Sequence, residues 1–254
     1  RITRNNLIPL TGCFYSFFLP LHLKDKHYNV MDKKDIIKKL QNEAAHFLAE
    51  SKLIVKGLVI LPKEIEIYYY IDGDFEDSSV HRNILQQNNR NHFYIHRWGI
   101  KKEDSYKGGN YPGIDFVLSN EKGIYYSYLI RSAVVDNDIH VGPHKVLEAI
   151  IDKSGLTTNE LESSPIEILP NSISCDVLFS SRINLGKNAK EFSDYKLRAV
   201  LCDEWFGRNK YPAKEKMVVD FLTEKVRLQN MTPQQAMEYA NKKLGYIPSS
   251  IRAL

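Results

Sequence analysis

Cysteine is scarce in this sequence, and its three cysteines, Cys13, Cys175 and Cys202, lie far apart. They provide neither the paired spacing of a cysteine zinc site nor the framework of a disulfide-rich domain. This scarcity favours a reducing, cytosolic environment. Cys175 and Cys202 lie in apolar stretches, where a cysteine more often fills space in the core than acts as a nucleophile.

Long hydrophobic runs are also missing. The longest apolar stretch, residues 13–23, is interrupted by Ser16, Pro20 and His22. It falls short of the ~20 residues that a membrane helix requires, so we expect no membrane association. Neither sign of charge dominates, because 35 basic and 31 acidic residues leave a net charge of +4. A pI near 8.7 gives no independent indication of nucleic-acid binding.

Motifs of several well-known chemistries are absent. The sequence has no G-x-S-x-G hydrolase motif, no H-E-x-x-H zinc motif and no P-loop. A glycine-rich stretch at residues 107–113 lacks the P-loop spacing and any following helix pattern. His81, His92 and His96 follow the acidic residues of 72–77, but without the spacing of a metal site. We therefore predict neither a metal nor another cofactor.

The composition is that of an ordinary globular protein, and the chain divides into three parts. Of 254 residues, 43% are hydrophobic and 26% charged, which excludes disorder, collagen and coiled coil for the whole chain. Residues 1–30 show no regular period, and we predict that they are disordered or non-native. Met31 opens an amphipathic helix in the main domain, residues 31–212. Residues 213–254 are predicted to be a helical extension, in which a capping box begins at Thr232.

Between these helices, runs of β-branched and aromatic residues predict strands. The apolar run 53–61 is one, and Glu64–Ile71, which alternates over its first half, is the next. Gly142-Pro143 then predicts a helix from His144 to Ile151. The other predicted strands are residues 92–97, 113–118, 124–135, 173–179, 181–185 and 196–202. The pattern therefore predicts one α+β domain with C-terminal helices.

The segment Glu64-Ile65-Glu66-Ile67-Tyr68 contains a candidate site. Alternation along a strand places Glu64, Glu66 and Tyr68 on the same face. A carboxylate and a phenol two residues apart can line one pocket, one as a base and the other as a stacking wall. A solvated strand face is the commoner explanation of such a pattern.

Aromatic and basic residues alternate just before the glycine-rich stretch. His96, Arg97 and Trp98 are followed by lysines at 101, 102 and 107 and by Tyr106. This mixture is what stacking on bases and contact with phosphates require. A solvated hairpin tip explains the same residues equally well.

Five short motifs, and a histidine-arginine pair, then occur in a recognisable order over residues 45–206. The segment Y-L-I-R-S-A at 128–133 resembles a strand ending in L-L-R-A, and G-P-H-K-V-L at 142–147 resembles a G-P-x-K-L helix start. S-R-I-N-L at 181–185 resembles A/P-R-I/V-G-V, and residues 192–205 resemble a closing strand with P-L-R-F. Upstream, Glu66-Ile67-Tyr68 resembles E-A-Y, and His81-Arg82 lies close to the place of an H-S/T pair. Together they resemble the alkyladenine (3-methyladenine) DNA glycosylase family, as a divergent and uncharacterised branch.

The resemblance implies an α+β domain around a curved antiparallel sheet flanked by helices. It also implies hydrolysis of the N-glycosidic bond of alkylated or deaminated purines in double-stranded DNA, after the nucleotide is flipped out of the stack. Glu66 would activate the attacking water. The remaining implied residues are a base pocket of Tyr68, His81, Tyr94, His96 and Asp115, and DNA contacts or a wedge at Trp98, Arg131 and Arg182. Such an enzyme uses no metal and would be cytoplasmic, at the nucleoid in a bacterium.

Asp115 departs from the family, which has an asparagine there. A second carboxylate would change base selection and repel phosphate unless it is protonated or paired. Two alternatives follow: a relative that binds a modified base, nucleotide or nucleic acid without cleavage, and a nucleoside hydrolase with Glu66 and Asp115 as a carboxylate pair. Catalysis is favoured if both carboxylates face one pocket, and binding alone is favoured if Glu66 faces solvent or a salt bridge.

Overall fold

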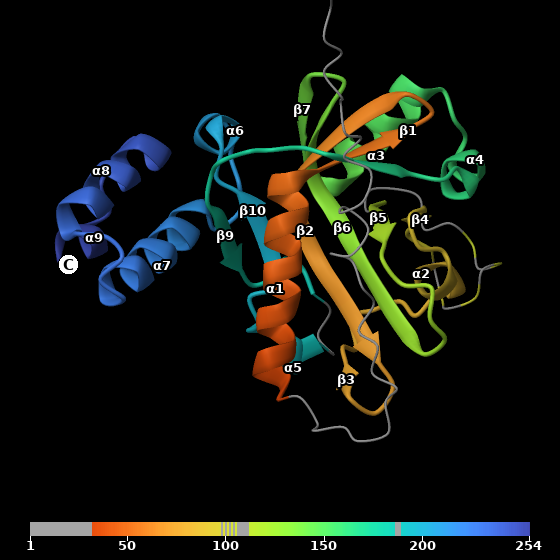
Figure 1. The fold of residues 1–254 in the computed structure, drawn as a ribbon, viewed down its shortest axis with the longest axis horizontal. Coiled ribbons are helices and arrows are strands. Elements are labelled where there is room, and N and C mark those ends of the chain that lie inside the picture. The colour runs from red at the N-terminus through yellow and green to blue at the C-terminus, as the bar shows by residue number, and fades with distance from the viewer. Residues whose placement is uncertain are drawn as a thin grey trace, which may run out of the picture.

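One curved antiparallel sheet, with helices on both of its faces, organises the chain (Figure 1). The computed structural model describes residues 32–97, 99, 101, 103, 105, 112–185 and 189–254. The described helices are α1 Lys33–Glu50, α2 Ile84–Asn88, α3 Pro143–Ser154, α4 Thr158–Ser163, α5 Lys190–Ser193, α6 Glu204–Arg208, α7 Lys214–Arg227, α8 Pro233–Leu244 and α9 Ser249–Arg252. The described strands are β1 Ser51–Val55, β2 Leu58–Ile71, β3 Phe75–Glu76, β4 Phe93–Ile95, β5 Ile114–Val117, β6 Ile124–Val135, β7 Asp138–Val141, β8 Glu167–Pro170, β9 Val177–Ser180 and β10 Arg198–Leu201.

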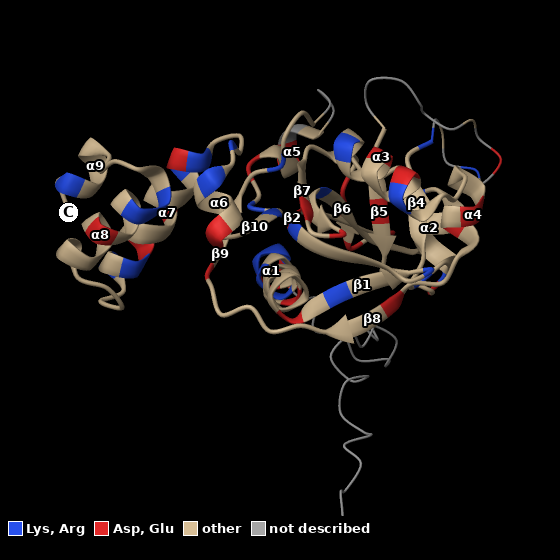
Figure 2. Ribbon diagram, turned by 90° about the horizontal axis from the view of Figure 1, so that it is seen from above, with Lys and Arg blue, Asp and Glu red and all other residues tan. Residues whose placement is uncertain are grey.

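The long strand β2 is the centre of the sheet, whose main path is β4-β5-β6-β2-β1-β8. One edge of β2 pairs with β6 along nearly its whole length. Its other edge pairs first with β1 and then with β10, which continues to β9. The sheet curves around α1, which Figure 2 shows almost end-on. The predicted α+β class with a curved antiparallel sheet is confirmed.

Helix α1 forms where the sequence predicts it, and its apolar side fills the inside of the curve. Asp32 caps the helix by accepting a hydrogen bond from the backbone N–H of Lys34. The buried stripe recurs at helical spacing. It consists of Ile36, Leu40, Ala44, Phe47 and Leu48. The proposed disorder of residues 1–30 lies outside the described residues.

The predicted strand over residues 53–61 is wrong, because the chain turns inside that apolar run. Lys56 and Gly57 both have positive φ, 49° and 84°, the conformation of a two-residue hairpin turn. The turn separates β1 from β2, and β2 then continues through Pro62 to Ile71. Pro62 lacks an N–H to donate, and the register with β6 shifts between Pro62 and Ile65.

The two faces of β2 have opposite character. Ile65, Ile67 and Tyr69 join the apolar core around α1. The alternating residues Glu64 and Glu66 therefore point to the other face, although both are almost fully buried. Buried carboxylates need partners, and this face of the sheet supplies them.

The C-terminal helices pack on the far end of the sheet. The capping box at Thr232 and the left-handed Gly245 that ends α8 confirm the predicted final helix. A second apolar cluster joins Leu178 of β9 and Val200 of β10 to the helices, whose contributions include Met217 and Ala236. Among the described residues, no helix is long and apolar enough to cross a membrane.

Replacing Phe47 with alanine should strongly destabilise the fold. Its ring is fully buried and packs against Phe116 at 5.5 Å and Tyr128 at 4.9 Å between ring centroids. We expect Phe47→Ala to lower the free energy of unfolding by about 3–5 kcal/mol. The half-exposed Val59→Ala in β2 should change it by roughly 0.5 kcal/mol. Urea denaturation measures both, and equal small losses would contradict this account of the core.

Candidate functional site

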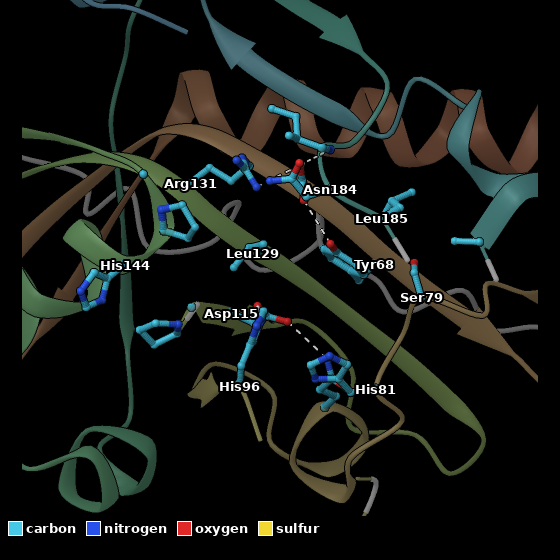
Figure 3. A pocket seen from close by; sticks show the side chains of 18 of the residues that line it. Tyr68, Ser79, His81, His96, Asp115, Leu129, Arg131, His144, Asn184 and Leu185 are labelled. Atoms are coloured by element: carbon cyan, nitrogen blue, oxygen red, sulfur yellow. Dashed lines mark hydrogen bonds and ion pairs between the residues drawn. The ribbon is translucent and has the colours of Figure 1, made fainter. Parts of the chain in front are cut away.

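A cavity of about 1070 Å³ opens on the polar face of the sheet (Figure 3). Its floor comes from β2, β5 and β6, and its walls come from residues 78–81, the start of α3 and residues 183–185. Six of the residues proposed from the sequence line it. They are Glu66, Tyr68, His81, His96, Asp115 and Arg131.

Strand register explains why residues so distant in sequence meet here. Glu66 in β2 lies opposite Leu129 in β6, and Leu129 lies opposite Asp115 in β5. Residues directly opposite on antiparallel strands point to the same face. Two strand spacings separate the Cα atoms of Glu66 and Asp115 by roughly 10 Å. In Figure 3, Leu129 lies between Tyr68 and Arg131 on one side and Asp115 and His96 on the other.

The Glu66 carboxylate is enclosed by hydrogen-bond donors. Its Oε1 accepts from the backbone N–H of Ile183 at 2.8 Å, and its Oε2 accepts from the Tyr68 hydroxyl at 3.1 Å. Arg131 Nη1 lies 3.3 Å from Oε1. Burial raises the pKa of Glu66, while Arg131 and the Ile183 amide act in the opposite direction. A buried carboxyl with a raised pKa is suited to accept a proton near neutral pH.

Arg131 connects Glu66 to a second buried carboxylate. Its Nε lies 3.2 Å from Oε1 of Glu64, and Nε of the fully buried Arg198 lies 2.7 Å from the same oxygen. Glu64 does not line the cavity. The sequence pattern predicts a shared face for the two glutamates. In the structure, Glu66 lines the cavity, whereas Glu64 lies outside it and forms ion pairs with Arg131 and Arg198.

Asp115 is buried and paired. The condition under which its negative charge would not repel phosphate, a pairing partner, is therefore met. Its Oδ1 lies 2.8 Å from Nε2 of His96, and its Oδ2 accepts from Ser127 at 2.8 Å and from Gln86 at 3.2 Å. Burial alone would raise the pKa of Asp115. The charge and hydrogen bond of His96, with the Ser127 hydroxyl, outweigh that effect and hold the pKa below its usual value.

Tyr94 does not line the cavity as the sequence analysis proposes. It is fully buried in β4, and its hydroxyl lies 3.0 Å from Nδ1 of His81. Tyr94 lies opposite Asp115 in the register of β4 and β5 and so points to the same face of the sheet. It lies behind His81, which its hydroxyl contacts, and His96, whose ring is 5.9 Å away, and these two histidines line the cavity in its place.

Arg182 cannot contact DNA, because its side chain is completely buried. Its Nη1 lies 2.7 Å from Oδ2 of Asp77 and donates to the carbonyl of Ile67 at 3.1 Å. The guanidinium stacks 4.7 Å from the centre of the Tyr68 ring. Arg182 therefore holds the pocket tyrosine in place. Asp77 also accepts hydrogen bonds from the N–H and hydroxyl of Ser79, a wall residue.

The predicted strand over residues 181–185 is also wrong, and the reason is the site itself. This segment is irregular, and Asn184 has a φ of 58°. Arg182 turns inward to Asp77 while the next residue, Ile183, donates its N–H to Glu66.

Trp98, the proposed wedge, lies outside the described residues.

The start of α3 forms another wall of the cavity. Gly142, Pro143, His144 and Lys145 line the cavity. Gly142 provides no side-chain cap to the helix.

Ser127 and Gln86 are site residues that the sequence analysis misses. Ser127 could have been found, because it shares the face of Leu129 and Arg131 along β6; Gln86 carries no such signal.

Among the described residues, no group of histidine, cysteine or acidic side chains could hold a metal ion. Comparison with known proteins adds no assignment, since neither the protein-family models nor the curated proteins include a match to this chain. The geometry of the cavity and the motifs in the sequence are therefore the grounds for assigning a function.

Neutralising Asp77 should destabilise the protein far more than neutralising a surface carboxylate. Asp77→Asn leaves the buried Arg182 without a counter-charge, at a cost of about 3–5 kcal/mol. The matched control is Asp138→Asn, which breaks an exposed pair with Lys153 and should cost about 1 kcal/mol or less. Chemical denaturation followed by circular dichroism compares the two. Similar losses would show that the Arg182 pair does not hold the pocket together.

Proposed function

We propose that this protein is a base-excision glycosylase, which hydrolyses the N-glycosidic bond of alkylated or deaminated purines in double-stranded DNA. The observation that carries the proposal is the buried Glu66 on the cavity floor, with Tyr68 beside it and Arg131 in contact. The cavity is large enough for a flipped nucleotide, because ligand pockets commonly span roughly 300–1,000 Å³. Cytoplasmic localisation, at the nucleoid in a bacterium, belongs to the same proposal.

In this reaction, the flipped base would lie between Tyr68 and the histidines of the opposite wall. Glu66 would accept a proton from the water that attacks the anomeric carbon. Burial raises the pKa of this carboxylate and so makes it a stronger base, while Arg131 favours its ionised form. His144 and Lys145, which line the cavity at the start of α3, would contact a phosphate of the bound strand.

A second candidate function, binding of a modified base without cleavage, is favoured by the partners of Glu66, because its carboxylate forms the salt bridge with Arg131 that the sequence analysis set as the sign of binding alone. The side chain of Glu66 has no exposed surface, and its two oxygens already accept from Ile183 and Tyr68. For hydrolysis, the attacking water must replace the Tyr68 hydroxyl as the hydrogen-bond donor to Oε2. If it does not, the cavity binds its ligand and the reaction does not follow.

Replacing Glu66 with glutamine should abolish base release while preserving binding. Glutamine keeps the shape of the side chain but cannot accept the proton of water, so we expect a loss of about 10²–10⁴-fold in rate. The assay incubates duplexes containing hypoxanthine, ethenoadenine or methylated purines and scores alkali-labile abasic sites.

The matched control for this assay is Glu64→Gln. It removes a carboxylate from the same arginine, Arg131, but outside the cavity. Folded Glu64→Gln protein should retain more activity than Glu66→Gln. Equal activity of the wild type and Glu66→Gln would contradict hydrolysis by Glu66, and tight binding without release by the wild type would support the binding function.

The activity should fall on acidification at a higher pH than an ordinary carboxyl would require. Glu66 acts as a base only when ionised, and burial raises its pKa. The active form is therefore lost as the pH falls through this raised value. The pH dependence of kcat/KM measures the acidic limb. A rate that stays constant until the usual range of a glutamate would contradict the assignment.

A further inference from the structure

Positive charge is concentrated in the part of the chain that follows the family-like motifs. Residues 207–254 contain nine basic and four acidic side chains, whereas residues 32–206 contain 22 basic and 26 acidic ones. The first set therefore has a net charge of +5 and the second a net charge of −4. Cations that neutralise phosphates provide most of the affinity for duplex DNA. The nearly balanced charge of the whole chain thus conceals a basic C-terminal part.

Contacts between the C-terminal helices bring six basic side chains to one end of this part. Lys214 Nζ donates to the carbonyl of Asn209 at 3.1 Å, which holds the start of α7 against the end of α6. Lys243 Nζ donates to the carbonyl of Asp203 at 3.3 Å, which holds the end of α8 against the start of α6. We call this region the basic end, and its basic residues are Arg208, Lys210, Lys214, Lys216, Lys242 and Lys243.

Acidic side chains near the basic end are bound by other groups. Asp203 Oδ2 lies 2.7 Å from Nζ of Lys63, which is itself buried. Glu215 accepts a hydrogen bond from the Tyr246 hydroxyl at 2.5 Å. These contacts hold both carboxylates in place, so the positive charge of the basic end remains available to an anion.

Several cations of the basic end are accessible to such an anion. Lys210 and Lys242 are exposed and form no ion pair with any described residue. Arg208 and Lys216 each pair with a carboxylate one helical turn away, and their own side chains are 67% and 73% exposed. Ion pairs of this kind on a helix surface are weak, so a phosphate can replace the carboxylate.

Arg198 attaches the basic end to the polar face of the sheet. Its Nη1 donates to the carbonyl of Pro212, between α6 and α7, at 3.0 Å, and its Nε pairs with Glu64. Glu64 also pairs with Arg131, which lines the cavity. Val141, another residue of the cavity wall, packs against the apolar cluster of the C-terminal helices. The basic end therefore adjoins the cavity, and Figure 2 shows α6 next to β10.

We infer that the basic end binds phosphates of the duplex beside the nucleotide that occupies the cavity. This inference rests on the proposed function and adds to it a DNA-binding surface outside the family-like motifs. A duplex carries one phosphate charge per ~1.7 Å of its axis, so several phosphates lie within reach of a surface that adjoins the cavity. Contacts with phosphates position a protein on DNA without reading its sequence. Binding by the basic end is therefore independent of the damaged base.

The test measures binding to an undamaged, fluorescently labelled duplex by anisotropy between 50 and 200 mM salt. The double variant Lys210→Gln/Lys242→Gln removes two exposed cations from the basic end. We expect its affinity at the lowest salt to fall by about 10–10²-fold and the slope of log K against log salt to decrease by about 2.

The matched control is Lys34→Gln/Lys38→Gln, which removes two exposed cations from α1 on the opposite face of the sheet. It should leave both the affinity and the slope nearly unchanged. Circular dichroism confirms that both double variants are folded. On a duplex containing hypoxanthine, the release rate at saturating protein should be the same for Lys210→Gln/Lys242→Gln and the wild type, because the cavity is intact.

The outcomes distinguish this inference from the proposed function. Equal affinities and slopes for the two double variants would overturn the role of the basic end and leave the glycosylase untouched. A selective loss of duplex binding by Lys210→Gln/Lys242→Gln would support the basic end even if the wild type releases no base. Wild-type binding to vesicles containing phosphatidylserine, but not to the duplex, would identify a membrane surface and overturn the inference.

Discussion

The buried carboxylates on the polar face of the sheet must each meet a cation or a set of hydrogen-bond donors, and the rest of the cavity depends on that requirement. An unpaired buried charge costs several kcal/mol, so every carboxylate there fixes the position of another side chain. The pairs are Glu64 with Arg198 and Arg131, Glu66 with Arg131, Asp77 with Arg182, and Asp115 with His96. Together with the hydrogen bond from Ile183 to Glu66, these pairs attach β10 and residues 182–183 to the polar side of the sheet.

The same pairs give the two cavity carboxylates opposite properties. Burial raises the pKa of Glu66 despite Arg131, whereas His96 and the Ser127 hydroxyl hold the pKa of Asp115 low against the effect of burial. Environments that separate two carboxylates in this way are how one site supports both acid and base steps. Under the proposed function, the raised pKa suits Glu66 to accept a proton, and the lowered pKa suits Asp115 to remain ionised beside His96. The surroundings of the two carboxylates therefore differ.

The sequence predicts the elements whose pattern is local and misses those that depend on the site. Helix α1, strand β6 and helix α8 follow from periodicity and capping residues. The turn at Lys56-Gly57 is hidden inside an apolar run, and the irregular path of residues 181–185 follows from contacts with Asp77 and Glu66 that are more than a hundred residues away. The site residues on β2 could be predicted, since alternation places Glu66 beside Tyr68. The pairing of His96 with Asp115 could not, because it depends on how β4 and β5 align.

The most direct test of the central claim is a crystal structure of the wild-type protein bound to a duplex with a 2′-fluorinated, hydrolysis-resistant purine nucleotide. The account predicts that this nucleotide is flipped into the cavity, with its base between Tyr68 and His96 and its anomeric carbon facing Glu66. A duplex bound elsewhere on the protein, or a nucleotide whose sugar lies away from Glu66, would contradict it.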